Sequence, residues 1–215
     1  MNELDFSFIE YPDYILTETS TKIKSKNLGE KFALIQSFFM DYLKEYHIPV
    51  NLIRLEGTNS LKIQQHQRFP FYIKILNVVD KRTAKLFSKK EGEVLTLPII
   101  EYHYLQPNNS LISESHIISF DLSSVEDLKV MNRICSKVNA VLKSFFERRD
   151  LQLAEFVCCF GKKGNKVMLV DDFTPKSIKA IPVNGNNGDN IDPYKLNNAQ
   201  SLKKYTDLLY NLMSL

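Results

Sequence analysis

Several amino-acid types are scarce in this chain of 215 residues, which has no tryptophan, 7 glycines and 3 cysteines. Three cysteines cannot build a disulfide framework, and Cys158 and Cys159 are adjacent in the chain. Cysteine usage therefore favours a reducing compartment and predicts a cytoplasmic location. The few glycines form no G-x-x-x-x-G-K motif, which excludes the common phosphate-binding loop.

Long apolar runs and a strong excess of one charge are also missing. No run approaches the about 18 residues that a membrane-spanning helix needs, and the first residues, MNELDFSFIE, are acidic rather than typical of a signal peptide. The 28 basic and 25 acidic residues are interspersed and leave a net charge of +3. Charge therefore gives no argument for nucleic-acid or membrane binding, and we expect neither partner.

What is present is a mixture of helical and strand patterns typical of a globular protein. Apolar residues at helical spacing predict a helix over about 27–44, a second over about 124–148 and a last one over 198–214. Ser123 and Glu126 have the spacing of a capping box, which predicts the start of the second helix.

Strand-like runs surround these helices. Short apolar runs occur in residues 4–24, and further strands are expected in HIPVNLIRLEG, NSLKIQQ, FPFYIKILNVV, IIEYHYL, LAEFVCCFG and KVMLVDDF. KRTAKLFSKKEGEVLTLP is expected to be a basic connecting segment, and PVNGNNGDN a mobile polar loop. The uneven mixture predicts an α+β fold, with a small N-terminal lobe over 1–67 and a larger α+β lobe over 68–215.

Two adjacent carboxylates, Asp171 and Asp172, end a predicted hairpin, FGKKGNKVMLVDDFTP. Paired acids at a strand end are suited to holding a metal ion, and a solvated turn is the alternative interpretation. The basic residues of 81–90 are likewise either a phosphate-binding surface or a solvated face. Cys158 and Cys159 are either a redox or soft-metal site or one buried and one outward-facing cysteine of a strand, of which the second is the commoner case.

From about Gly29 to Pro175, the order of several phrases resembles the SAICAR synthetase family, the phosphoribosylaminoimidazole-succinocarboxamide synthases of purine biosynthesis. HIPV resembles the family's GIPT, EGEVLTLPIIEYHYL its EG…LxxPxxE segment, and SLISESHI its DPxIxExH stretch. KVNAVLKSFFERRDLQLAEFVCCFG resembles KxNxxLxxxFxxxGxxLVDFKLEFG, and VMLVDDFTP resembles IxLxDExSPD. Each phrase alone is weak, but their shared order makes the likeness specific.

The resemblance implies a two-lobed α+β fold, here with a shortened N-terminal β-rich lobe, and a nucleotide in the cleft. It implies a reaction in which ATP activates the carboxylate of carboxyaminoimidazole ribotide as an acyl phosphate, which the amine of aspartate then attacks. Magnesium and ATP are the implied cofactors, the ribotide and aspartate the implied partners, and a homo-oligomer the implied assembly.

The family's phrases also imply a metal site built from carboxylates. The aspartate of DE corresponds to Asp171, which Asp172 follows here, and the aspartate of VDF corresponds to Glu155. Cys159 replaces the glutamate of EFG, and a neutral thiol is a poor ligand for magnesium. The resemblance therefore predicts Asp171, Asp172 and Glu155 as metal-site residues, with one carboxylate missing.

The nucleotide- and phosphate-binding candidates by resemblance are Arg82, Lys85 and Lys179. The family's VVRNxxAGSxxKR aligns with KILNVVDKRTAKL, which puts Leu76 at the arginine and Lys81 and Arg82 at Gly-Ser, and keeps Lys85. Lys179 replaces the arginine of SPDxSR and keeps the charge but not the bidentate fork. The segment DYILTETSTKIKSKN lacks the glycines of the family's nucleotide-covering strands.

These substitutions leave two function hypotheses. One is a divergent ligase with the family reaction and weak or absent activity, because loss of one preorganised charge-stabilising group costs on the order of 10²–10³ in rate. The other is a non-catalytic protein that binds a phosphorylated ligand or a protein partner on the same scaffold. The sequence assigns no catalytic residue under either hypothesis.

Overall fold

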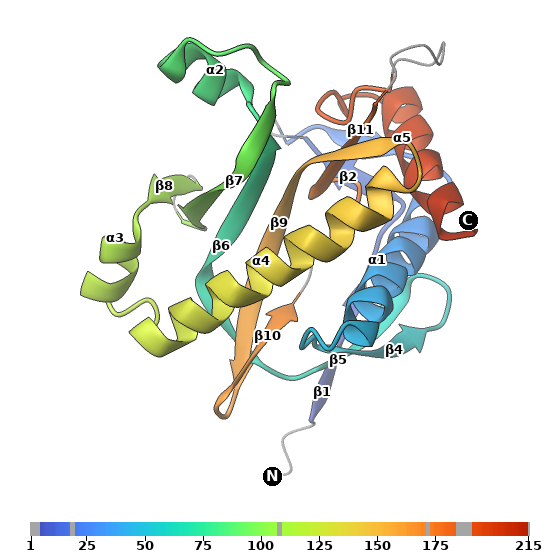
Figure 1. Cartoon of the computed structure of the whole chain (residues 1–215). Coiled ribbons are helices and arrows are strands. Elements are labelled where there is room, and N and C mark those ends of the chain that lie inside the picture. The colour runs from blue at the N-terminus through green and yellow to red at the C-terminus, as the bar shows by residue number, and fades with distance from the viewer. Residues whose placement is uncertain (1–4, 18–19, 107–108, 171–172, 184–190, 215) are drawn as a thin grey trace.

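The computed structural model describes residues 5–17, 20–106, 109–170, 173–183 and 191–214. Its centre is an antiparallel sheet of six strands, in which β10-β9-β6-β7-β8 are successive neighbours and β11 also pairs with β9 (Figure 1). The predicted α+β class is confirmed, since helices and an antiparallel sheet occupy separate layers. The strands are β6 (Gln67–Val78), β7 (Val94–Tyr104), β8 (Ser110–Ile112), β9 (Leu151–Lys163), β10 (Lys166–Val170) and β11 (Ile178–Pro182).

Helix α4 (Val125–Glu147) crosses one face of this sheet and confirms the second predicted helix (Figure 1). The predicted capping box at its start is wrong. Ser124 is the N-cap, since its Oγ accepts a hydrogen bond from the Asp127 N–H at 3.1 Å, whereas Ser123 Oγ donates to the Ser124 carbonyl oxygen. The two serines are adjacent and equally suited to capping, so the sequence pattern alone is one residue off.

Helices α1 (Leu28–Glu45) and α5 (Ala199–Asn211) pack against each other, and the short 3-10 helix η1 (Leu212–Ser214) follows α5 (Figure 1). The rings of Phe38 and Phe39 in α1 lie 5.7 and 5.4 Å from the ring of Phe145 in α4. Both predicted helices are therefore confirmed, and the apolar face of the first is a core face, as its helical spacing indicates.

The first part of the chain forms two further small sheets. Strands β1 (Phe6–Glu10), β5 (Ser60–Gln64) and β4 (Leu52–Glu56) pair in that order, and β2 (Tyr14–Leu16) pairs with β3 (Lys22–Lys24) as a hairpin. The strands expected in this region are confirmed. The largest core cluster draws buried residues from both sides of position 67, and the division into lobes stays a prediction.

Two short helices are absent from the sequence-based prediction. The expected connecting segment instead contains helix α2 (Lys81–Phe87) and, from Val94, the start of β7. Helix α2 is capped by Asp80, whose side chain accepts the Thr83 N–H at 2.7 Å. Helix α3 (Glu114–Ser119) follows Ser113. Thr83 is the one buried residue of α2, so no apolar face marks it in the sequence. None of the described helices is both long and apolar enough to cross a bilayer.

Candidate functional site

Three rows of side chains cross the face of the six-stranded sheet that points away from α4. Cys158 contacts Cys135 of α4, and because side chains alternate along a strand, its neighbours Val157 and Cys159 point to the opposite face. Charged and aromatic residues gather on this open face. Successive Cα partners define the rows, which are Ile99, Leu76, Glu155 and Lys179; Glu101, Lys74 and Val157; and His103, Tyr72, Cys159 and Val170.

Lys74 and Glu155 form an ion pair on the open face. Lys74 Nζ lies 2.8 Å from Glu155 Oε2, and the two side chains are 21% and 11% exposed. Tyr194, from the segment before α5, lies beside this pair. The Tyr194 side chain is half-exposed, and its partial burial and the Glu155 carboxylate raise the pKa of its hydroxyl above the ordinary value. The hydroxyl is therefore neutral and can donate a hydrogen bond.

Glu101 lies in the neighbouring row and contacts two basic side chains. Its Oε1 pairs with Arg82 Nη2, and its Oε2 lies 3.1 Å from His103 Nε2. The His103 ring stacks on Tyr72 with centroids 4.9 Å apart. Glu101 is only 6% exposed, and a buried carboxylate requires partners of this kind. The ion pair therefore tethers the start of α2 to the open face.

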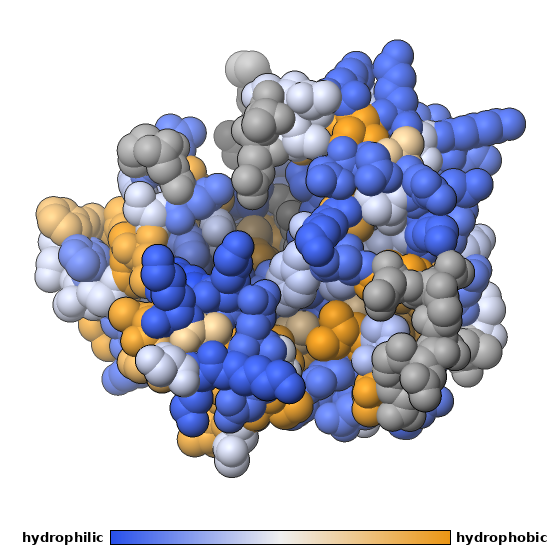
Figure 2. Space-filling view, turned by 90° about the horizontal axis from the view of Figure 1, so that it is seen from above, coloured by the Kyte–Doolittle hydropathy of each residue, from blue (hydrophilic) through white to orange (hydrophobic). Residues whose placement is uncertain are grey.

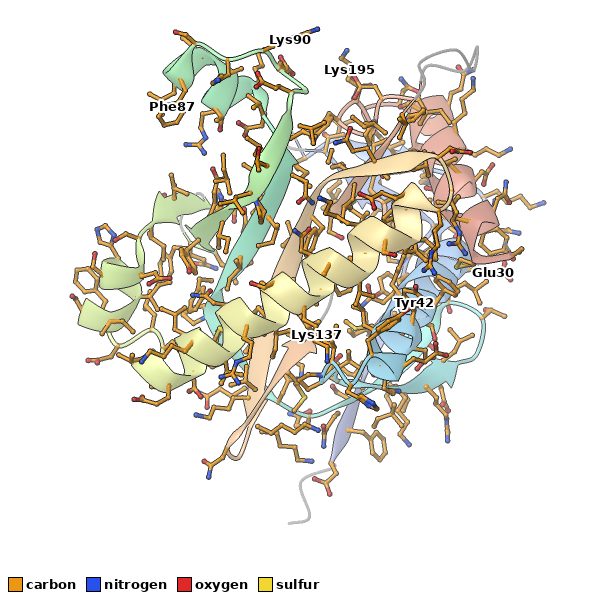
Figure 3. All side chains as sticks on the ribbon, in the orientation of Figure 1. Glu30, Tyr42, Phe87, Lys90, Lys137 and Lys195 are labelled. Atoms are coloured by element: carbon orange, nitrogen blue, oxygen red, sulfur yellow. The ribbon has the colours of Figure 1, made fainter. Side chains whose placement is uncertain are left out.

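A cavity of about 900 Å³, here called the α2 cavity, lies over the Lys74–Glu155 pair. Its charged wall residues come from two segments, namely Asp80, Lys81, Arg82, Lys85 and Glu91 in and around α2, and Asp192 and Lys195 before α5. Figure 2 views this end of the molecule and shows a hollow with hydrophilic side chains on both sides. In Figure 3, Lys195 stands across from Phe87, at the end of α2, and from Lys90, in the segment that follows α2.

A second cavity of about 470 Å³, here called the hairpin cavity, lies beside the first. The β2–β3 hairpin contributes Thr17 and Thr21 to its lining, and Lys179 lines it from β11. Lys179 Nζ donates a hydrogen bond to the Pro175 carbonyl oxygen at 3.2 Å. Tyr194 lines both cavities, so the two ligand-sized spaces meet at one side chain.

The structure brings together three of the residues predicted from the sequence. Arg82, Lys85 and Glu155 all line the α2 cavity, and Lys179 lines the hairpin cavity. The carboxylates at 171–172 lie outside the described residues, as does most of the predicted mobile loop over 182–190. The roles given to these residues remain predictions.

The described residues do not complete a magnesium site. Glu155 is already paired with Lys74, and Cys159 is buried in an apolar cluster with Met168 and Val170. Within the described ranges, no three side chains of the histidine, cysteine, aspartate or glutamate type gather to hold a metal. A hard cation prefers several oxygen ligands, which this part of the site does not supply. Cys158 and Cys159 point to opposite faces of the sheet, but both are buried, so the expectation that one of them faces outward to solvent is wrong.

Four residues of this site were not identified from the sequence as candidates, namely Lys74, Glu101, His103 and Tyr194. The alternation of Tyr72, Lys74 and Leu76 along β6 is a signal for Lys74, since these residues must share one face. Tyr194 follows the predicted polar loop, and no local pattern relates it to β9. The position of Tyr194 beside β9 is set by the tertiary path of the segment before α5.

Comparison with known proteins gives one consistent result. A family model described as SAICAR synthetase matches residues 17–199. The phosphoribosylaminoimidazole-succinocarboxamide synthase of Staphylococcus epidermidis is 24% identical over 96% of this chain and 90% of that protein. The crystal structure of SAICAR synthetase from Pyrococcus horikoshii has a TM-score of 0.88 at 22% identity, with coverage of 98% of this chain and 93% of that chain.

A SAICAR synthetase solved in complex with ADP is similar to the same extent. Its TM-score is 0.88 at 22% identity, with coverage of 99% of this chain and 92% of that chain. At these identities the solved structures establish a shared fold.

Proposed function

Because this chain belongs to the SAICAR synthetase family, we propose that it binds ATP in the hairpin cavity and a phosphorylated carboxylate in the α2 cavity, and that it joins this carboxylate to the amine of aspartate. The observation that carries the proposal is the meeting of the two cavities at Tyr194. Phosphoryl transfer needs its two substrates adjacent and oriented, and adjoining cavities provide that proximity.

The proposed reaction has two steps. A carboxylate oxygen of the ribotide attacks the γ-phosphorus of ATP, and ADP leaves with the electron pair of the broken P–O bond. The aspartate nitrogen then attacks the acyl carbon, and phosphate leaves with the electron pair of the C–O bond while the nitrogen loses a proton. The product is a succinocarboxamide, and each ATP yields one ADP and one phosphate.

The residues of the two cavities have distinct proposed roles. Lys179 faces the nucleotide phosphates from β11, and the ADP complex of a related enzyme supports a nucleotide site in this fold. Lys85 holds the ribotide phosphate at the exposed wall of the α2 cavity, and Arg82, which is paired with Glu101, positions that wall. Magnesium, when bound, would withdraw charge from the phosphates. The residues proposed to hold it are those predicted from the sequence, Asp171, Asp172 and Glu155.

The proposed activity is weak. Leu76 and Cys159 stand on the open face where the family phrases carry an arginine and a glutamate. Each missing charge-stabilising group lowers a rate by on the order of 10²–10³, and such losses are only partly compensated. We therefore expect turnover far below that of an enzyme with the complete set of charges.

A second candidate function is ligand binding without turnover. The observation that favours it is the apolar cluster of Cys159, Met168 and Val170, which fills part of the open face with side chains unable to stabilise charge. Under this hypothesis the cavities bind the same ligands, but no ADP is released.

The test is an assay of the purified protein with ATP, magnesium, carboxyaminoimidazole ribotide and aspartate. ADP release and the succinocarboxamide product are followed together, and binding of ATP and of the ribotide is measured by calorimetry. Lys85→Met should weaken ribotide binding by about 10-fold or more, as expected for one charged contact. Lys137→Met is the matched control, because Lys137 lies on α4 on the other side of the sheet (Figure 3).

The outcomes separate the hypotheses. Product formation supports the ligase, and binding of both ligands without ADP release supports the second candidate. Binding of neither ATP nor the ribotide at millimolar concentration contradicts both.

A further inference from the structure

Lys74 is the most deeply placed cation of the α2 cavity. Its side chain is 21% exposed, whereas that of Arg82 at the cavity wall is 51% exposed. Lys81 and Lys85 are also exposed. A lysine that is mostly removed from water needs an anionic partner, and Glu155 supplies one at 2.8 Å.

The ion pair leaves Lys74 able to bind a further group. An ammonium carries three N–H donors, and the contact with Glu155 uses one of them. Among the described residues, Glu155 Oε2 has no hydrogen-bond partner of ordinary geometry, and Lys74 Nζ contacts it as an ion pair. The other N–H groups of Lys74 can therefore donate to a ligand in the cavity while the ion pair with Glu155 is kept.

The position of Lys74 in the sheet has a counterpart on the next strand. The phrase LVDFKLEFG carries a lysine four residues before its glycine, and the same position here, counted from Gly161, is Val157. Val157 of β9 is the direct Cα partner of Lys74 of β6. Directly opposed residues on one face have Cβ atoms about 4.5–5.5 Å apart, so long side chains from either position reach the same space.

We propose that Lys74 binds an anionic group of the substrate on the floor of the α2 cavity, and that it does so in place of a lysine at position 157. This inference rests on the proposed function. The group is a carboxylate or a phosphate, since both present oxygen acceptors to an ammonium. The available sources are the phosphate of the ribotide, the carboxylate of the ribotide and a carboxylate of aspartate.

The test exchanges the two positions. Lys74→Met removes the cation, and the double variant Lys74→Met/Val157→Lys returns it from the neighbouring strand. Each protein is titrated calorimetrically with inorganic phosphate, with aspartate and with carboxyaminoimidazole ribotide in separate experiments, and Lys137→Met serves as control. Lys74→Met should lower the affinity for at least one probe by about 10- to 100-fold, and the double variant should recover most of the loss.

The three probes identify the source of the anion. Weaker binding of phosphate and of the ribotide assigns Lys74 to the ribotide phosphate, and weaker binding of the ribotide alone assigns it to the ribotide carboxylate. Weaker binding of aspartate alone assigns it to a carboxylate of aspartate. Equal binding of all three probes by Lys74→Met and the wild type overturns the inference. If the double variant does not recover affinity, the claim that Lys74 replaces a lysine at position 157 is wrong.

Folding and function are controlled separately. Lys74→Met leaves a buried Glu155 without its cation, so each variant's thermal transition is measured, and Lys74→Arg, which keeps the charge, should keep most of the affinity. If the wild type turns over ATP or binds the ribotide while Lys74→Met is unchanged, only the role of Lys74 is wrong. If the wild type binds neither ATP nor the probes, the proposed function fails and this inference fails with it.

Discussion

The hydroxyl of Tyr205 in α5 joins two backbone groups of β11, since it accepts a hydrogen bond from the Ala180 N–H at 2.9 Å and donates one to the Ile178 carbonyl oxygen at 2.8 Å. These two residues flank Lys179, at the point where the β9–β11 register shifts. Tyr205 therefore fixes the strand that presents Lys179 to the hairpin cavity.

Tyr205→Phe should destabilise the protein by about 1–3 kcal/mol, because a buried N–H and a buried carbonyl lose their partner while the ring remains. Urea unfolding measures the loss. ATP binding should weaken as well if Lys179 faces the phosphates. Unchanged unfolding would mean that water or another group satisfies the two backbone atoms.

Asn77→Ala should also cost about 1–3 kcal/mol in unfolding free energy. Its amide exchanges two hydrogen bonds, of 2.8 and 3.0 Å, with Asn139 of α4, and both side chains are buried between helix and sheet. A double-mutant cycle with Asn139→Ala checks the coupling. The double variant should lose less than the sum of the single variants, and simple additivity would contradict a paired role.

Gly161→Ala should destabilise the hairpin of β9 and β10. A Cβ at this position would lie 2.4 Å from His66 Cδ2 and 2.9 Å from Val170 Cγ1, which is closer than such atoms approach. The expected cost is about 1–3 kcal/mol by thermal or urea unfolding. His66→Ala in the same chain should relieve part of it. An alanine variant as stable as the wild type would show that the ring moves away freely.

Alkaline pH should destabilise the fold through its buried tyrosines. Burial, with a contact to Glu114 for Tyr102, raises the pKa of both Tyr102 and Tyr205 above the ordinary value. The unfolded chain, with tyrosine pKa values of about 10, releases these protons first, so stability is full below about pH 10 and falls as the pH rises beyond it.

Urea unfolding between about pH 8 and about pH 12, with tyrosinate absorbance, measures this effect. Tyr205→Phe should show a shallower fall in stability, because it removes one of the titrating groups. A stability that stays constant across this window would contradict the assignment.

Helical and strand periodicity predicted most of the fold because its elements bury one face. The α1 helix was recognisable from the spacing of Phe32, Ile35 and Phe39, which are all buried. Helix α2 was not, because Leu86 and Phe87 at its end are exposed and only Thr83 is buried. A helix without a buried face leaves no periodic trace in the sequence.

The site was only partly predictable for a related reason. The order of the family-like motifs predicted Arg82, Lys85 and Glu155 as site residues, and all three line one cavity. Tyr194 lies 39 positions from Glu155 in the chain, and its contact with that residue arises only from the tertiary path before α5. Such a contact has no signature in local sequence.

A single tyrosine ring forms part of the wall of both cavities. Any ligand that shifts the Tyr194 ring changes the room left for the other ligand, so the two occupancies are thermodynamically linked. Linkage of this kind is reciprocal, and the factor by which nucleotide alters ribotide affinity equals the factor by which ribotide alters nucleotide affinity. The order in which the substrates arrive then changes the path of assembly but not the stability of the assembled complex.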